Sequence, residues 1–231
     1  MKRINNVSLK NKYIDKYGLN NFFTNDMSEY MELILFEKND YICKESEKMN
    51  YLYFFVEGKA KVYVILKNGK SLLLCFYYPM TVLGDLELVN NCDTTTNIQV
   101  LRDSYCIAID LSKVRENLLL DAKFLRYACD SLGGKLQRSS NNSSINLLYP
   151  LENRLASYIM AAAEEVIINN KEALLFNENL TEIAELLGTS YRHLLRTLNN
   201  LRDKGAIIKS NSGYIIENKN ILSMLAADLY K

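Results

Sequence analysis

The sequence predicts an α+β protein with three parts in chain order: an N-terminal β-sandwich or barrel, a long helix, and a C-terminal winged helix-turn-helix. Short β-type runs separated by turn signals fill residues 33–110, and a helical pattern without proline covers residues 122–148. After residue 179, two short amphipathic helices flank a glycine and are followed by two short strands. We therefore expect three parts, at residues 1–121, 122–149 and 150–231.

Composition narrows the class of protein. The 231 residues suffice for two domains, and an apolar content of 48% is enough to bury a core. We recognise no signal peptide and no apolar stretch long enough to span a membrane. The cysteines are scattered and odd in number, so we expect reduced, mostly buried thiols of a cytoplasmic protein rather than a disulfide framework. They are Cys43, Cys75, Cys92, Cys106 and Cys129.

Charge is concentrated in one segment. The net charge of +1 over the whole chain does not by itself indicate nucleic-acid binding. Between Gly188 and Ser210, however, Asp203 is the only acidic residue. The cations of this segment are Arg192, Arg196, Arg202, Lys204 and Lys209. A basic face on an otherwise neutral protein is typical of a nucleic-acid-binding domain.

The N-terminal part begins with one or two short helices in residues 1–30 that cap a domain. From Leu33 the pattern changes to short runs rich in aromatic and β-branched residues, which is typical of a β-sandwich or barrel. The runs are LILF, YIC, YLYFFVEG, AKVYVIL, SLLLCFYY, NIQVL and YCIAI. Asn68-Gly69 favours a type I′ hairpin turn, and Gly58 marks another tight turn. We expect the Tyr and Phe side chains here to pack in the core rather than to form a ligand cage.

After Asp110 the periodicity becomes helical. We predict a short helix at 113–119 and a long one at 122–148, weakened at Gly133-Gly134 by about 1 kcal/mol per glycine relative to alanine. A stripe in 4-3 spacing along the long helix is typical of a coiled-coil seam. Its members are Leu125, Cys129, Leu132, Leu136, Ser139, Ser143 and Asn146. We expect the apolar members, from Leu125 to Leu136, to form a homodimer interface. Packing against the chain's own β-part is the alternative.

Pro150 ends the long helix and can begin the next one at its first turn. A further amphipathic helix is predicted at 151–168, with Glu164 and Glu165 as solvated neighbours on it. Its inward positions are Leu155, Ile159, Ala162, Ala163 and Val166. Residues 169–179 are interpreted as a polar loop, and 220–230 as a terminal amphipathic helix.

The segment from 180 to 208 predicts two short helices joined by a tight turn. Apolar residues at 183, 186 and 187 give the first helix one buried face, Asn179 can cap it, and Gly188 ends it. Ser190 caps the second helix, which turns Leu194, Leu195 and Leu198 inward, and Gly205 ends it. The following IIKSNSGYIIE predicts two short strands around a Ser-Asn-Ser-Gly turn, a β-wing.

The second helix leaves Tyr191, Arg192, His193 and Arg196 facing outward. An exposed N-terminal turn with these side chains suits a helix that reads base edges in DNA. We expect DNA contacts from Thr189, Ser190, Tyr191, Arg192, His193 and Arg196, with Arg192 and Arg196 as the principal ones. A helical hairpin with a solvated charged face is the alternative, which the wing in the correct order disfavours.

A β-part, a long helix and a winged helix-turn-helix in this order resemble the Crp/Fnr superfamily of bacterial transcription regulators over nearly the whole chain. Residues 82–86 (VLGDL) are similar to the opening of the family's phosphate cassette, and residues 183–192 (IAELLGTSYR) to its helix-turn-helix. Arg154 stands where the family commonly has an arginine. The resemblance implies an N-terminal sensory domain of the double-stranded β-helix, cupin-like or jelly-roll type, then a dimerisation helix. It also implies a homodimeric, sequence-specific regulator whose DNA half-sites lie about one helical turn apart.

The resemblance is weaker at the effector site. Cyclic-nucleotide binders of this family hold the ribose with a Gly-Glu pair and the cyclic phosphate with a following arginine. Here the first pair is Gly84-Asp85, and Thr95-Thr96 stands in place of the arginine pair. Because a buried phosphate without a cation is costly, we expect an effector other than cyclic AMP, or none. A polar pocket and a purely structural role both stay open for Gly84, Asp85, Leu86, Thr95, Thr96, Lys135, Ser139 and Ser140.

The sequence shows none of the residue groupings that catalysis or metal binding would require. The only histidine, His193, lies on the predicted recognition helix, and no Cys/His grouping suits zinc, haem or an iron–sulfur cluster. We therefore expect no cofactor and no catalysis, which also disfavours a cupin-type enzyme. The alternative function is a cyclic-nucleotide-domain-like regulatory module that acts through protein partners. The expected partners are double-stranded DNA and a second copy of the chain, with RNA polymerase as a further candidate and no membrane.

Overall fold

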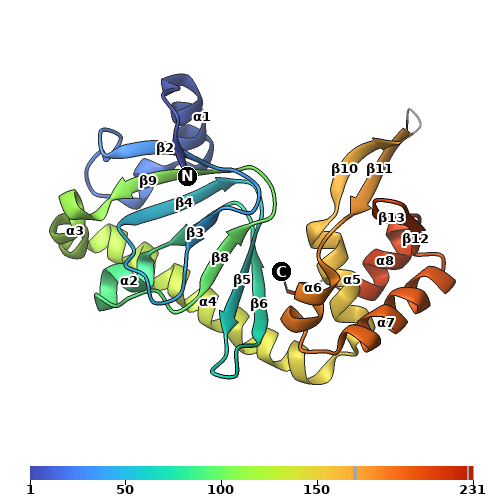
Figure 1. Cartoon of the computed structure of the whole chain (residues 1–231). Helices are drawn as coiled ribbons and strands as arrows, with labels where there is room; N and C mark the ends of the chain where they lie inside the picture. The colour runs from blue at the N-terminus through green and yellow to red at the C-terminus, as the bar shows by residue number, and fades with distance from the viewer. Residues whose placement is uncertain (169–170, 228, 231) are drawn as a thin grey trace. The chain divides into compact units, whose positions relative to one another are not determined.

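The computed structural model describes residues 1–231 except 169–170, 228 and 231 (Figure 1). The chain forms two compact units, Met1–Val64 with Phe76–Arg138 and Ile65–Cys75 with Ser139–Lys231. The long helix α4, Ala122–Leu148, belongs to both, with its first half in the first unit. The predicted α+β class is confirmed. Among the described residues, no helix combines the length and apolar character that a membrane span requires.

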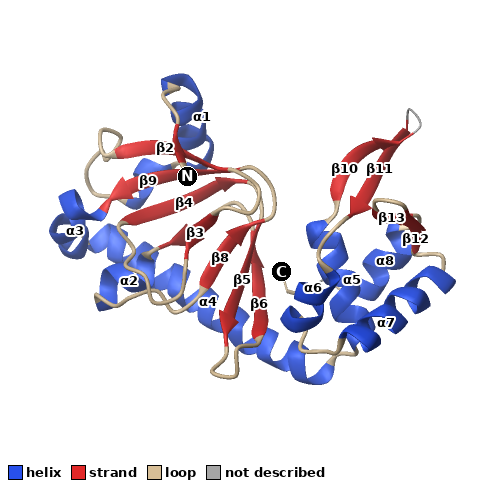
Figure 2. Ribbon diagram, in the orientation of Figure 1, coloured by secondary structure: helices blue, strands red, loops and turns tan. Residues whose placement is uncertain are grey.

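The β-part consists of two sheets (Figure 2). One has the strand order β1-β2-β9-β4-β7 and the other the order β3-β8-β5-β6. The strands are β1 Lys2–Arg3, β2 Met31–Phe36, β3 Tyr41–Cys43, β4 Tyr51–Glu57, β5 Ala60–Ile65, β6 Ser71–Tyr77, β7 Thr81–Leu83, β8 Asn97–Val100 and β9 Ser104–Asp110. All seven runs predicted from aromatic and branched residues are strands, whereas β1 and β7 were not predicted. The helical elements of this part are α1 Val7–Tyr17, the 3-10 helix η1 Leu19–Phe22, α2 Asp85–Asn90 and α3 Leu111–Leu120.

Aromatic side chains pack the core of the first unit, as predicted. Phe54 of β4 and Phe124 of α4 are fully buried, and the rings of Phe23 and Phe124 stack at 5.4 Å between centroids. Phe22 stacks on Tyr127 at 3.9 Å. The Asp121 carboxylate accepts hydrogen bonds from the amides of residues 123 and 124, so it caps α4. These contacts fix the first turns of α4 on the β-part.

The turn at Asn68-Gly69 differs from the prediction. Gly69 has a φ of 79°, but Asn68 does not have a positive φ, as a type I′ turn would require. The Gly69 amide donates to the Leu66 carbonyl, and the Leu66 amide donates to Lys70. The loop is therefore a type I turn followed by Gly69 in the left-handed conformation, so Asn68 does not have to adopt a positive φ. At Gly58, which has a φ of 118°, the chain bends between β4 and β5, strands of the two different sheets.

The helix predicted at 151–168 is only half correct. Helix α5 spans Leu151–Ala162, and Glu164–Ile168 is strand β10, paired antiparallel with β11, Lys171–Phe176. The polar loop predicted at 169–179 is therefore wrong for residues 171–176, and residues 169–170 lie outside the described part. Branched residues at 166–168 favour a strand once a partner strand is available, and they overrode the helical periodicity. Glu164 and Glu165 consequently occupy successive strand positions.

The second unit also holds the two predicted short helices and the wing. These are α6 Leu180–Leu186, α7 Tyr191–Asp203, β12 Ile207–Ser210 and β13 Gly213–Ile216. The strands form a sheet in the order β10-β11-β13-β12. The terminal helix α8, Lys219–Ala226, ends earlier than predicted because Ala227 adopts a left-handed conformation, with a φ of 46°.

Candidate functional site

Three local motifs set the geometry of the α6–α7 pair. The Asn179 side chain accepts from the amides of residues 181 and 182 and begins α6. Gly188, with a φ of 62°, ends it in a Schellman motif: the Gly188 amide donates to Glu185 and the Thr189 amide to Ala184. The Ser190 hydroxyl then accepts from the His193 amide and begins α7. The sequence predicted all three terminal residues correctly.

Helix α7 has one buried and one exposed face. Leu194, Leu198 and Leu201 are fully buried, Thr197 is 4% exposed, and Leu195 is only half-buried. Arg154 of α5 donates from Nη1 to the Leu187 carbonyl at 2.7 Å, which holds the end of α6 on α5. The outward side chains of α7 are therefore presented on a packed support.

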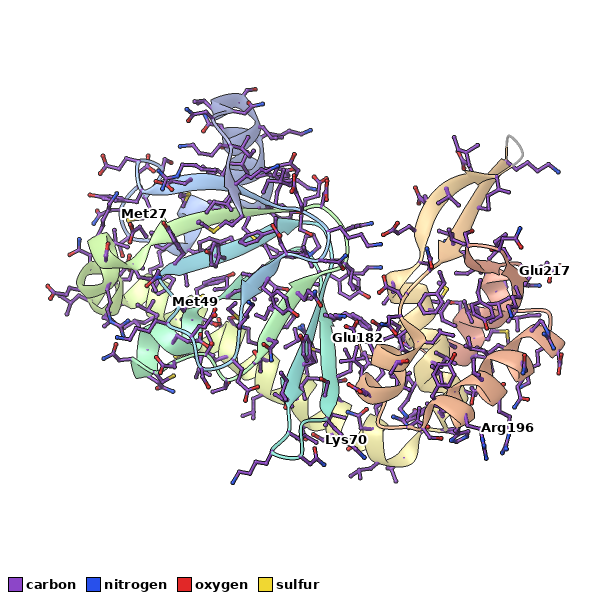
Figure 3. All side chains as sticks on the ribbon, in the orientation of Figure 1. Met27, Met49, Lys70, Glu182, Arg196 and Glu217 are labelled. Carbon is purple, nitrogen blue, oxygen red and sulfur yellow. The ribbon has the colours of Figure 1, made fainter. Side chains whose placement is uncertain are left out.

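The recognition turn, defined here as residues 189–196, carries the predicted DNA-contacting residues. Tyr191, Arg192, His193 and Arg196 are exposed, and Figure 3 shows Arg196 projecting away from the ribbon of α7. The Thr189 hydroxyl is hydrogen-bonded to Nδ1 of His193 at 3.2 Å, so the imidazole is oriented by the residue before the helix cap. The Ser190 side chain is engaged in capping.

The five cations of this segment divide into two groups. Lys204 pairs with Glu152 at 2.7 Å, and Arg202 pairs with Asp203 at 3.5 Å. Within the part of the chain that is described, Arg192, Arg196 and Lys209 form no ion pair. The charge available to a polyanion therefore lies on the recognition turn and on the wing strand β12.

The cassette, defined here as residues 84–96, is built around Gly84 and Asp85. Gly84 has a φ of 90°, and a Cβ there would lie 2.7 Å from the Tyr51 carbonyl oxygen, so only glycine fits. It starts the unpredicted helix α2, of which Asp85 is the first residue. Asp85 is 1% exposed, whereas Leu86 is half-buried.

Asp85 is bonded to α4. Lys135 Nζ lies 2.5 Å from Asp85 Oδ1, and the Ser131 hydroxyl donates to Asp85 Oδ2 at 2.9 Å. Lys135 was predicted as a possible source of charge for a ligand, but in the structure its charge is paired with this carboxylate. Ser131 was missed, although it lies one turn before Lys135 and so on the same helix face.

The threonines of the cassette supply no charge. The Thr94 hydroxyl is buried and donates to the carbonyls of Lys44 and Glu47, so it serves the loop between β3 and β4. Thr95 is exposed and Thr96 half-exposed. Burial raises the pKa of Glu87, the other acidic residue of α2. Ser139 and Ser140 are exposed residues of α4 in the second unit.

Helix α4 carries two neighbouring stripes. The stripe that packs on its own chain contains Phe124, Ala128, Ser131, Lys135 and Asn142. The predicted seam lies one residue further on: Leu125 and Leu132 are half-buried, Cys129 is exposed, and Leu136 is 74% exposed. The chain itself therefore covers the apolar seam only in part and leaves Cys129 and Leu136 exposed.

The five cysteines are free thiols that differ in exposure. Cys43, Cys75 and Cys106 are buried thiols, while Cys92 and Cys129 are exposed. Burial raises the pKa of Cys43 to about 12, which keeps that thiol unreactive. The described His, Cys, Asp and Glu residues form no group of three that could hold a metal ion.

Comparison with known proteins identifies both parts. A cyclic nucleotide-binding domain model matches residues 33–119, and a Crp-like helix-turn-helix domain model matches residues 153–225. The regulatory protein YeiL of Escherichia coli O157:H7 is 34% identical over 207 residues, which covers 90% of this chain and 91% of that protein. A CRP-like cAMP-activated global transcriptional regulator of Mycobacterium tuberculosis is 20% identical over 202 residues, covering 87% and 90%.

The fold has counterparts among solved structures. A transcriptional regulator of the CRP family from Thermus thermophilus superposes with a TM-score of 0.66 at 16% identity, over 86% of this chain and 98% of that one. The matched helix-turn-helix domain contains the exposed recognition turn, and the sequence relatives are regulatory proteins. The chain therefore belongs to the Crp/Fnr family of DNA-binding transcription regulators.

Proposed function

We propose that this regulator acts as a homodimer that binds a specific DNA sequence through the recognition turn, with an effector other than cyclic AMP or with none. The observation that carries the proposal is the contrast between the unpaired cations of the recognition turn and the internally paired carboxylate of the cassette. The cations of the recognition turn are available to bind a polyanion such as DNA. The Asp85 carboxylate already forms an ion pair with Lys135 of the same chain.

Arg192 and Arg196 are the proposed principal DNA contacts. Arg192 lies in the first turn of α7 and can reach both acceptors of a guanine edge, an interaction worth about 1–3 kcal/mol of discrimination. Arg196 lies one turn later, where it can read a base or hold a phosphate. Tyr191 and His193, which is hydrogen-bonded to Thr189, flank them. Lys209 on wing strand β12 is a further proposed contact, to the DNA phosphate backbone.

The proposed dimer interface is the apolar seam of α4. Leu136 is 74% exposed, so its methyl groups gain most from burial against a second copy. Gly133 and Gly134 have open space where their Cβ atoms would lie, which allows a second backbone to approach closely there. The seam and the packed stripe are adjacent on one helix, so a dimer through the seam leaves the packing of each chain unchanged.

Analytical ultracentrifugation of Leu136→Asp tests the interface. An aspartate there stays solvated in the monomer but becomes an unpaired buried charge in a dimer, so we expect the variant to sediment as a monomer. The matched control is Leu120→Asp, because Leu120 is 85% exposed and lies off α4. If Leu136→Asp keeps the wild-type sedimentation coefficient, the interface lies elsewhere.

Two features argue against cyclic AMP as the effector. Thr95 can donate one hydrogen bond to a phosphate but brings no charge, and Asp85 would have to leave Lys135 to hold a ribose. The loss of a charge-assisted bidentate pair costs a few kcal/mol, or roughly two or more decades of affinity.

Calorimetric titration with cyclic AMP and cyclic GMP tests this part of the proposal. We expect no binding at micromolar ligand, and a Kd below about 10 μM would refute it. The companion variant Thr95→Arg restores the missing cation. Combined with Lys135→Met, which releases Asp85, it should bind cyclic AMP measurably if the cassette otherwise keeps the shape of its family.

A further inference from the structure

The C-terminal end of the described chain turns back onto the body of the second unit. Ala227 and Tyr230 have φ values of 46° and 63°, a left-handed conformation that non-glycine residues adopt only when their surroundings hold them. Leu229 is 4% exposed and Tyr230 is 1% exposed. Leu229 and Tyr230, called the tail below, are therefore packed against the second unit.

Hydrogen bonds tie this tail directly to α5 and α4, and through Asn146 to β6. The Ser157 hydroxyl of α5 donates to the Leu229 carbonyl at 2.6 Å. The Tyr230 hydroxyl donates to Asn146 Oδ1 of α4 at 2.5 Å, and Asn146 Nδ2 donates to the Leu73 carbonyl of β6 at 3.3 Å. A continuous polar path thus runs from α5 through the tail to α4 and β6.

This hydrogen-bonded path bridges the short segment that joins α4 to α5. Helix α4 ends at Leu148 and α5 begins at Leu151, so Tyr149 and Pro150 join them. On the α4 side, Asn142, which is 5% exposed, also donates to a β6 carbonyl, that of Leu74, at 2.9 Å. The tail therefore adds a second, noncovalent connection across this joint.

The protonation state of Tyr230 suits its hydrogen bond to Asn146. Burial raises the pKa of the Tyr230 hydroxyl, and the nearby Arg154 guanidinium lowers it. The phenol therefore keeps its proton at neutral pH and can donate to Asn146. Removal of the hydroxyl would leave the Asn146 acceptor without this partner inside the protein.

We infer that Tyr230 and Asn146 are positioning residues for DNA recognition: their hydrogen bond fixes α5, and with it α7, on the last turns of α4. Helix α5 packs against both α7 and α8, and Arg154 joins it to the end of α6. The inference rests on the proposed function, because the pose of α7 on α4 matters only when two α7 helices must meet two half-sites together.

The test compares full and half operator sites. DNA recovered by selection from random sequence with the wild-type protein serves as the full palindromic site, and one half of it as the half-site. Fluorescence anisotropy then gives both Kd values for Tyr230→Phe, which keeps the ring and removes only the hydroxyl. The matched control is Tyr149→Phe, the same chemical change at the joint on a side chain that is 43% exposed.

We expect Tyr230→Phe to weaken binding to the full site about fivefold, with the half-site Kd unchanged within about twofold. Asn146→Ala should behave alike, and the double variant should be no worse than Asn146→Ala alone. An unchanged full-site Kd overturns the inference. Equal losses on both sites also overturn it, because the tail would then only stabilise the DNA-binding part.

Hydrogen–deuterium exchange gives an answer that does not depend on DNA. In the free protein, Tyr230→Phe should speed amide exchange in residues 139–148 of α4, whereas Tyr149→Phe should not. Unchanged exchange there overturns the inference. If the wild-type protein selects no DNA sequence while exchange responds as expected, the proposed function fails and the structural connection stands.

Discussion

The recognition turn and the cassette differ in how their charged groups are paired. Arg192 and Arg196 are exposed on a support fixed by caps and by Arg154. Asp85 is buried and paired with Lys135 within its own unit. A charge that is paired inside the chain must break that pair before it can serve a ligand, whereas an exposed cation only has to exchange its counterions. The pairing state of a charge is thus as informative as its position in a motif.

The largest expected effect comes from breaking the internal pair. Lys135→Met leaves the Asp85 carboxylate buried without a cation, which should lower the free energy of unfolding by about 2–4 kcal/mol and Tm by about 5–10 °C. Thermal unfolding by circular dichroism measures it. The control is the double variant Asp85→Asn with Lys135→Met, which removes both charges and should recover most of the loss. A Tm for Lys135→Met equal to that of the wild type would mean that the pair contributes nothing.

The next effect concerns specificity at the recognition turn. Arg192→Ala should relax the preference at one base position by about 1–3 kcal/mol, which a selection of binding sites from random DNA detects. Lys12→Ala on α1, far from α7 in the sequence, is the control. If the preferred sequence is unchanged and only overall affinity falls, Arg192 is a phosphate contact and its assignment to base reading is wrong.

A smaller expected effect is on the salt dependence of DNA binding, which should differ between a cation with no ion pair and a cation with one. Lys209→Ala should reduce the slope of log K against log salt by about 1, because one phosphate contact is lost. Lys204→Ala is the matched control, since Lys204 pairs with Glu152 and should leave the slope unchanged. Equal slopes for the wild type and Lys209→Ala would remove the wing from the interface.

The smallest effect lies in the pH dependence of the cassette. Burial raises the pKa of Glu87 above its unfolded value, so the ionised side chain destabilises the fold at neutral pH and protonation relieves this as pH falls. Glu87→Gln should therefore raise Tm slightly at pH 7, with the difference from the wild type shrinking toward acidic pH. A difference that is constant with pH would rule out this origin.

The sequence predicted the capping residues of the helix-turn-helix correctly, but it predicted the turn type at Asn68-Gly69 and the long-range pairings poorly. Asn179, Gly188 and Ser190 act through neighbours within a few residues, and Pro150 limits the end of α4, so these could be predicted. The strand β10 and the pairing of Asp85 with Lys135 could not, because a helical period does not reveal a partner strand and 4-3 spacing does not say which stripe packs inward. Ser131 and Lys135 share a stripe one position before the predicted seam. The Tyr230–Asn146 bond joins residues far apart in the sequence and left no local signal.

The central claim is that the recognition turn binds DNA while the cassette needs no cyclic nucleotide. The most direct measurement is the Kd of the purified wild-type protein for its selected DNA site, with and without about 1 mM cyclic AMP. We predict the same Kd, within about twofold, in both conditions. A Kd that cyclic AMP lowers tenfold or more, by about 1.4 kcal/mol, would contradict the claim, because Asp85 would then have exchanged Lys135 for a nucleotide.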